Sequence, residues 1–220
     1  MSPAAAAQFY AAPIGKKVIV AVTGFILFGF VLGHLLGNLQ VYAGPDKINA
    51  YAEFLHHNLG LLWGARLVLL ASVALHITAS LQLNALNNRA RPVGYQRREA
   101  VESSYASRTM IWSGPIIGAF VVYHLLHFTF GAVHPDFKDL NPYHNMVAGF
   151  RQLPVSLAYV VAMVLLGQHL YHGAWSMFQT LGVSHPRYTP LLKRFAAVAA
   201  ALLVAGNISI PISILLGMVS

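Results

Sequence analysis

Long apolar stretches dominate this sequence and limit what it can fold into. A helix needs about 20 residues to cross the hydrocarbon core of a bilayer. Five stretches reach that length, and we predict membrane spans at 18–41, 61–86, 110–131, 154–179 and 195–217. Only 9% of the 220 residues are charged, against about 25% in an average soluble domain. The sequence therefore predicts an all-α integral membrane protein, with residues 1–220 forming one bundle of five transmembrane helices.

The charged residues predict how the helices are oriented. Basic residues concentrate before the first span and in the second and fourth connections: Lys16, Lys17, Arg89, Arg91, Arg97, Arg98, Arg108, Arg187, Lys193 and Arg194. The first and third connections hold few basic residues and most of the acidic ones: Lys47, Lys138, Arg151, Asp46, Glu53, Asp136 and Asp139. The positive-inside rule then places the N-terminus in the cytoplasm and the C-terminus outside. The basic clusters need no nucleic acid to explain them, and they could also dock a cytoplasmic partner or anionic lipid headgroups.

Histidines lie deep in four of the five predicted spans. At 1.5 Å per residue, His34 and His124 lie roughly 21–24 Å from the cytoplasmic surface. His76 and His169 lie roughly 22 Å from the outer surface, because their helices run the other way. In a core of about 30 Å this makes two layers, roughly 14 Å apart, with two histidines from different helices in each.

Two histidines per layer are the ligand set of one six-coordinate haem iron, so the sequence predicts two haems stacked across the membrane. Ionisable residues at membrane depth are functional hypotheses by default. Small residues about one turn from the ligands would leave room for a flat macrocycle, although small residues also mark helix–helix contacts. These residues are Gly37, Ser72, Ser80 and Gly173, and the two serines could also orient His76.

The other histidines have less specific readings. His127 and His172 follow the favoured ligands by one turn and could bond a haem carboxylate, act as ligands themselves or simply pack. His56 and His57 fall in the first outer connection, and His134, His144 and His185 are predicted to be loop residues. With no cysteine in the chain, thiolate zinc sites and cysteine-ligated iron–sulfur clusters are excluded within it.

Four segments resemble the membrane-anchor cytochrome b subunit of succinate:quinone oxidoreductases, in the single-chain, five-helix, two-haem form shared with some fumarate reductases. They are "GHLLGNLQVYAG", "LHITASLQLNALNNRARPVGY", "SSYASRTMIWSGPIIGAFVVYHLLHF" and "HLYHGAWSMFQTLG". The resemblance implies the same pairing of helices as the depth argument. It also favours the first histidine of each close pair, since Gly114 precedes His124 by ten residues and His169 precedes "GAWS" by four.

The resemblance implies a role in respiration and the tricarboxylic acid cycle, in the inner membrane of a bacterium. The chain would anchor a flavoprotein and an iron–sulfur subunit on the cytoplasmic face, and pass electrons through both haems to a quinone, with menaquinone expected. Haem carboxylates need cationic or hydroxyl partners. The inner candidates are Arg89, Arg91, Ser107 and Arg108, and the candidates for a quinone site are Glu53 and Ser104.

Other classes of protein also carry many histidines. A di-iron desaturase needs several ligands clustered near one membrane face, whereas the deep histidines here are spread over two layers. A proton-coupled carrier with a histidine relay would favour acidic residues inside the spans, and the predicted spans contain none. Two alternatives stay open. One is the anchor of a quinol:fumarate reductase, in which electrons run in the opposite direction, and the other is a cytochrome b with another electron donor.

Overall fold

A computed structural model describes residues 3–90 and 105–220, with the side chains of 3, 5–7 and 105–108 left out of the description. Within this part of the chain the regular structure is entirely helical. Five helical segments are long and apolar enough to cross a membrane. They are Pro13–Ala43, Leu59–Arg89, Thr109–Phe128, Leu153–Thr180 and Thr189–Leu215. The predicted class is therefore confirmed for the described residues as an all-α structure with five helices long and apolar enough to span a membrane.

The predicted boundaries are close, with some corrections. Helix α2 (Pro13–Asn38) starts five residues before the predicted 18, because Pro13 occupies its first turn, where the missing N–H costs nothing. It continues as a 3-10 turn, η1 (Leu39–Ala43). Helix α5 (Tyr105–Phe128) ends before the predicted 131, because Gly131 turns the chain with a φ of 68°. Helices α4 (Leu59–Arg89), α7 (Leu153–Thr180) and α8 (Thr189–Leu215) complete the set.

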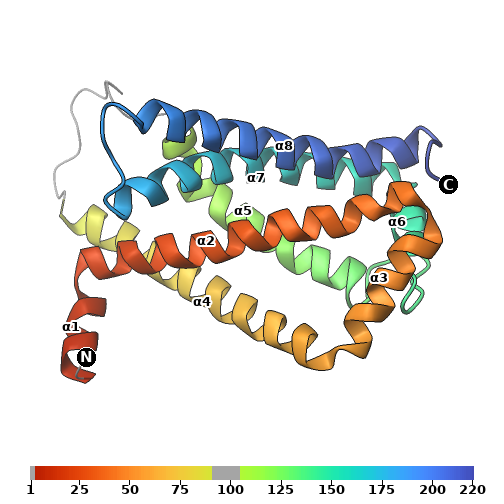
Figure 1. The fold of residues 1–220 in the computed structure, drawn as a ribbon, viewed down its shortest axis with the longest axis horizontal. Coiled ribbons are helices and arrows are strands. Elements are labelled where there is room, and N and C mark those ends of the chain that lie inside the picture. The colour runs from red at the N-terminus through yellow and green to blue at the C-terminus, as the bar shows by residue number, and fades with distance from the viewer. Residues whose placement is uncertain (1–2, 91–104) are drawn as a thin grey trace.

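Three shorter helices lie at the two ends of the bundle (Figure 1). Helix α1 (Pro3–Ala11) precedes the first span, while α3 (Pro45–His57) and α6 (Pro142–Phe150) lie at the opposite end. We call the end that carries Lys16, Lys17, Arg89, Arg187 and Lys193 the basic end. His144 is not a loop residue as predicted but lies on α6, whose first turn is capped by the Asn141 side chain.

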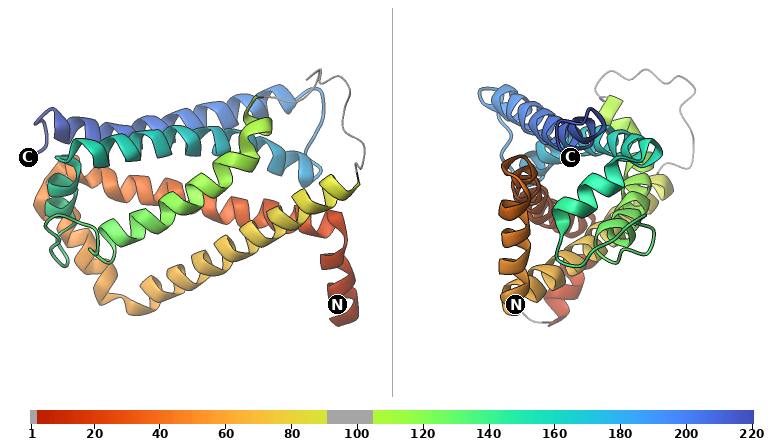
Figure 2. Two further views of the ribbon diagram at one scale, coloured as in Figure 1. Left: turned by 180° about the vertical axis from the view of Figure 1, so that it is seen from behind. Right: turned by 90° about the vertical axis from the view of Figure 1, so that its right-hand side faces the viewer.

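The long helices of the described structure pack against some of their neighbours and not against others. Helix α2 packs against α4 and α7, α5 against α7, and α8 against α7 (Figures 1 and 2). In the described part of the chain, α2 does not pack against α5, and α4 does not pack against α7. Many apolar side chains face outward, including Phe25, Leu70 and Leu202. A surface of this kind suits lipid and not water.

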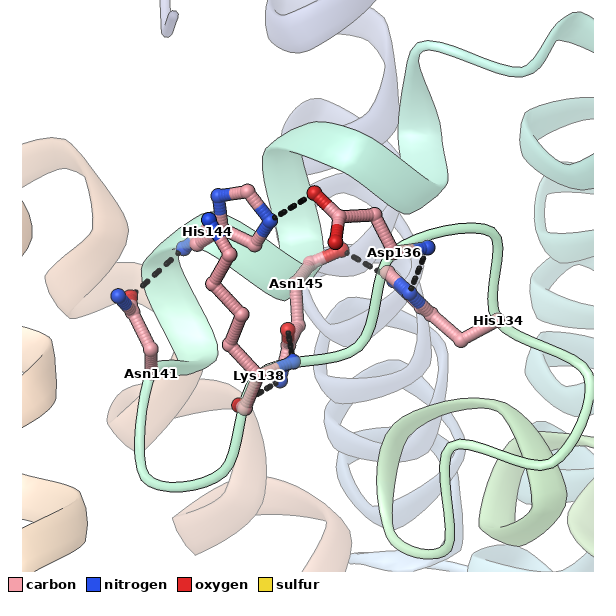
Figure 3. A network of polar contacts seen from close by, with 6 residues as sticks. All are labelled: His134, Asp136, Lys138, Asn141, His144 and Asn145. Atoms are coloured by element: carbon pink, nitrogen blue, oxygen red, sulfur yellow. Dashed lines mark hydrogen bonds and ion pairs between the residues drawn. The ribbon is translucent and has the colours of Figure 1, made fainter.

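The opposite end is closed by a polar network between the loop after α5 and helix α6 (Figure 3). The Asn145 amide bonds the backbone of Lys138 in both directions, at 2.8 and 2.9 Å. His144 pairs with Asp136 at 2.8 Å. The Asp136 N–H donates to His134 Nδ1, so His134 Nε2 carries the hydrogen that reaches the Asn145 carbonyl at 2.8 Å. His134 is therefore a satisfied structural residue.

Candidate haem sites

The predicted histidine pairs meet inside the bundle. The rings of His34 on α2 and His124 on α5 have centroids 5.7 Å apart and are perpendicular. The rings of His76 on α4 and His169 on α7 have centroids 6.3 Å apart. Neither of these helix pairs packs closely in the described part of the chain. Each of these helix pairs thus brings two imidazole rings close together.

The spacing of the rings suits a shared metal ion. With metal–nitrogen bonds of about 2 Å, two imidazoles on opposite sides of one ion have ring centres about 6 Å apart. Both observed separations, 5.7 and 6.3 Å, lie close to that value. The described residues contain no group of three or more histidine, cysteine or acidic side chains placed to hold a metal. Two imidazoles per site fit an iron whose other ligands come from a macrocycle, as in a haem.

Room beside the rings is the second requirement of a flat cofactor. A Cβ added at Gly33, next to His34, would meet nothing within 4 Å, and the same holds for Gly173, one turn after His169. The His34 side chain is exposed although it lies within a span, and His76, His124 and His169 are only partly buried. Protein atoms therefore leave space around both pairs. The donor set, the ring spacing and this space all fit haem.

The hydroxyl of Thr23 is a hydrogen-bond partner of His76. Thr23 Oγ1 lies 2.7 Å from the Ile19 carbonyl, to which it can donate its single hydrogen. It also lies 3.0 Å from His76 Nδ1. With its hydrogen on Ile19, the hydroxyl accepts from His76 Nδ1, and Nε2 then keeps the lone pair that a metal requires. Thr23 is 5% exposed, so water does not compete for this bond.

The other ligands have hydroxyl neighbours as well. Ser113, which is buried on α5, places Oγ 3.5 Å from His169 Nδ1, at the long limit of a hydrogen bond. The hydroxyl of Tyr159 on α7 lies 3.2 Å from His124 Nδ1. The ring of His34 stacks on that of Phe30, with the two ring centroids 5.3 Å apart. A hydroxyl on Nδ1 is the kind of partner that orients a metal-bound imidazole.

His127 occupies a different environment from His124. Its side chain is completely buried, with Nδ1 3.1 Å from the Tyr159 hydroxyl and Nε2 without a partner. A Cβ on Gly149 would lie 2.9 Å from its ring, so the chain backbone covers it closely. His124 instead faces His34. The packing around His127 leaves no room for a macrocycle, which favours His124 as the ligand.

Sequence reasoning missed Thr23, Ser113 and Tyr159, and it proposed Ser72 and Ser80 near His76. Within the described residues, His76 bonds Thr23 and neither serine. Gly37 contacts Tyr51 of α3, whose ring would lie 3.0 Å from an added Cβ, so this glycine serves helix packing. His172 is partly buried on α7, and its ring makes no hydrogen bond among the described residues.

The remaining predicted residues lie toward the ends of the bundle. Arg89 is at the last turn of α4, about 20 Å along the helix from His76. Glu53 is exposed on α3, and its carbonyl accepts from His57 Nδ1. Arg91 and Ser104 lie outside the described residues, as do the side chains of Ser107 and Arg108.

Comparisons with family models, with curated proteins and with solved structures found no match for this chain. Its function is therefore inferred from the site itself.

Proposed function

We propose that the chain is the di-haem cytochrome b anchor of a succinate:quinone oxidoreductase. The observation that carries this proposal is the meeting of four deep histidines in two pairs, each across helices that do not pack together. The pairing of all four deep histidines, at two depths, supports ligation of two cofactors. The sequence segments that resemble this family of anchors supply the identity of the complex.

The residues have separate roles in this mechanism. His76 and His169 would hold one haem toward the basic end, and His34 and His124 would hold the other. When bound, the haems supply one-electron redox chemistry. Thr23 would accept a hydrogen bond from Nδ1 of His76, and Tyr159 would orient His124 in the same way. The apolar spans exclude water from both sites, which influences the potentials.

The surroundings of the bundle extend the proposal. The basic end would face the bacterial cytoplasm, as the positive-inside rule requires, and the C-terminus would face outward. The flavoprotein and iron–sulfur subunits would bind at the basic end and deliver electrons to the nearer pair. A quinone, menaquinone by family resemblance, would accept them. Glu53 and Ser104 remain the residues that we predict to contact a quinone, Glu53 on the outer side and Ser104 on the cytoplasmic side.

The test is haem content of the purified complex, measured as pyridine haemochrome together with a reduced-minus-oxidised spectrum. We expect two b haems per chain. His34→Ala or His124→Ala should remove the haem farther from the basic end and spare the other. His76→Ala or His169→Ala should do the reverse. A complex that retains its flavin and lacks haem would refute the proposal.

A further inference from the structure

A pocket of about 470 Å³ lies at the basic end, between α1, α2 and α4. Its volume is within the usual range of small-molecule sites, about 300–1,000 Å³. Its polar side chains come from all three helices: Tyr10, Lys16, Gln82 and Arg89. Its apolar lining includes Ala85 and Leu86, on the outward side of α4. The pocket thus combines two cations with an apolar wall at the end of two spans.

Lys16 is a buried cation that has no ion-pair partner among the described residues. It is only 7% exposed, and its ammonium donates to the carbonyls of Tyr10 at 2.6 Å and Ala11 at 3.1 Å. It also lies 4.7 Å from the centre of the Tyr10 ring. The single ion pair among the described residues, His144–Asp136, is at the other end of the bundle. A buried charge normally has an ionic partner, and two carbonyls occupy only two of its three donors.

The walls of the pocket are held in place by contacts between helices. The Tyr10 hydroxyl donates to the Gln82 side chain at 3.1 Å, which joins α1 to α4. Gly15 allows the close turn between α1 and α2, because a Cβ there would collide with the Phe9 carbonyl. Arg89 is exposed at the mouth of the pocket, where its guanidinium has no ion-pair partner in the described part of the chain.

We propose that this pocket binds the phosphate of an anionic phospholipid, with Lys16 and Arg89 as its cations. A phosphodiester accepts from the free ammonium donor and from the guanidinium, which recognises phosphate oxygens. The acyl chains would lie against Leu86 and the outward face of α4. An anionic headgroup suits two cations better than a zwitterionic one, which brings its own positive charge. Arg89 is thereby assigned to the lipid and not to a haem carboxylate, and the inference is independent of the proposed function.

Native mass spectrometry of the full chain, titrated with phosphatidylglycerol or phosphatidylcholine, tests the proposal. We expect tighter binding of phosphatidylglycerol. Arg89→Gln and Lys16→Gln should each weaken it about fivefold, since a basic residue near an anionic headgroup contributes about 1 kcal/mol. Lys17→Gln and Arg66→Gln are the matched controls, because both are exposed cations outside the pocket, and they should leave binding nearly unchanged.

Several results would overturn the inference. Equal losses in the two control variants would indicate diffuse surface charge. Equal binding of both lipids would indicate an apolar groove, and displacement by inorganic phosphate would indicate a site for the free anion. If phosphatidylglycerol does not bind and Arg89→Gln releases the soluble subunits from the purified complex, the pocket holds a protein carboxylate. If Lys16→Gln fails to fold, the affinity of Arg89→Gln for phosphatidylglycerol is the deciding measurement.

Discussion

At the scale of residues, the Tyr159 hydroxyl is shared between two histidines. It lies 3.2 Å from His124 Nδ1 and 3.1 Å from His127 Nδ1. A hydroxyl has one hydrogen, so it can donate to only one of them. If His124 binds iron through Nε2, its Nδ1 carries a hydrogen and donates to Tyr159. Tyr159 then donates to His127, which leaves the hydrogen of His127 on the buried Nε2, the atom that has no partner.

Tyr159→Phe should raise the midpoint potential of the haem held by His34 and His124. Accepting a hydrogen from His124 makes the imidazole a more basic ligand and favours ferric iron, so loss of the hydroxyl favours reduction. A hydrogen bond contributes about 1 kcal/mol, which for one electron corresponds to about 40 mV. A spectroscopic redox titration measures it. Tyr123→Phe is the control, because its ring stacks on His127 at 5.5 Å and no described hydrogen bond uses its hydroxyl.

His127→Leu should retain both haems, whereas His124→Ala should lose one. Leucine fills most of the buried space and removes a polar atom that already lacks a partner, so the fold should tolerate it. Haem per chain is the measurement. If His127→Leu loses a haem while His124→Ala keeps two, His127 is the ligand and the assignment is reversed.

At the scale of helices, α7 is the element that connects the sites to the scaffold. It carries His169 and Tyr159 and packs against α2, α5 and α8. Gly167 allows the close approach of α8, because a Cβ there would collide with Val204. Helix α4 instead packs against α2, and it meets α7 through the rings of His76 and His169. Helix α5 packs against α7, and it meets α2 through the rings of His124 and His34. Cofactor binding should therefore contribute more to the placement of α4 relative to α7, and of α5 relative to α2, than to the contact between α7 and α8.

Gly167→Ala should lower stability by about 1–3 kcal/mol, the usual cost of overpacking a well-packed contact. Thermal unfolding of the purified chain, followed by circular dichroism, measures the effect. Gly118→Ala on α5 is the matched control, since a Cβ there meets nothing within 4 Å. Equal midpoints for the two variants would mean that α7 and α8 adjust to the added methyl group.

At the scale of the whole molecule, most of the predictions rest on two properties of the sequence: its hydropathy, and the depth of each residue along its predicted span. Length and apolar composition were enough to locate five spans. The same calculation of depth could have found Thr23. It lies about 8 Å from the cytoplasmic surface, at the predicted depth of His76. The calculation could also have found Tyr159, level with His124. Helices α3 and α6 were missed because, at 13 and 9 residues, they are too short to contain the span-length apolar run on which the prediction depends.

The orientation that we predict from the charged residues can be tested with single cysteines, since the chain has none of its own. Asp46 on α3 and Asn88 near the end of α4 are both exposed, at opposite ends of the bundle. We expect a membrane-impermeant maleimide to label Asp46→Cys in spheroplasts and Asn88→Cys only after permeabilisation, because the basic end is retained in the cytoplasm. The reverse pattern would place the pair His76 and His169 toward the outside. Electrons from cytoplasmic subunits would then have to enter at His34 and His124 instead.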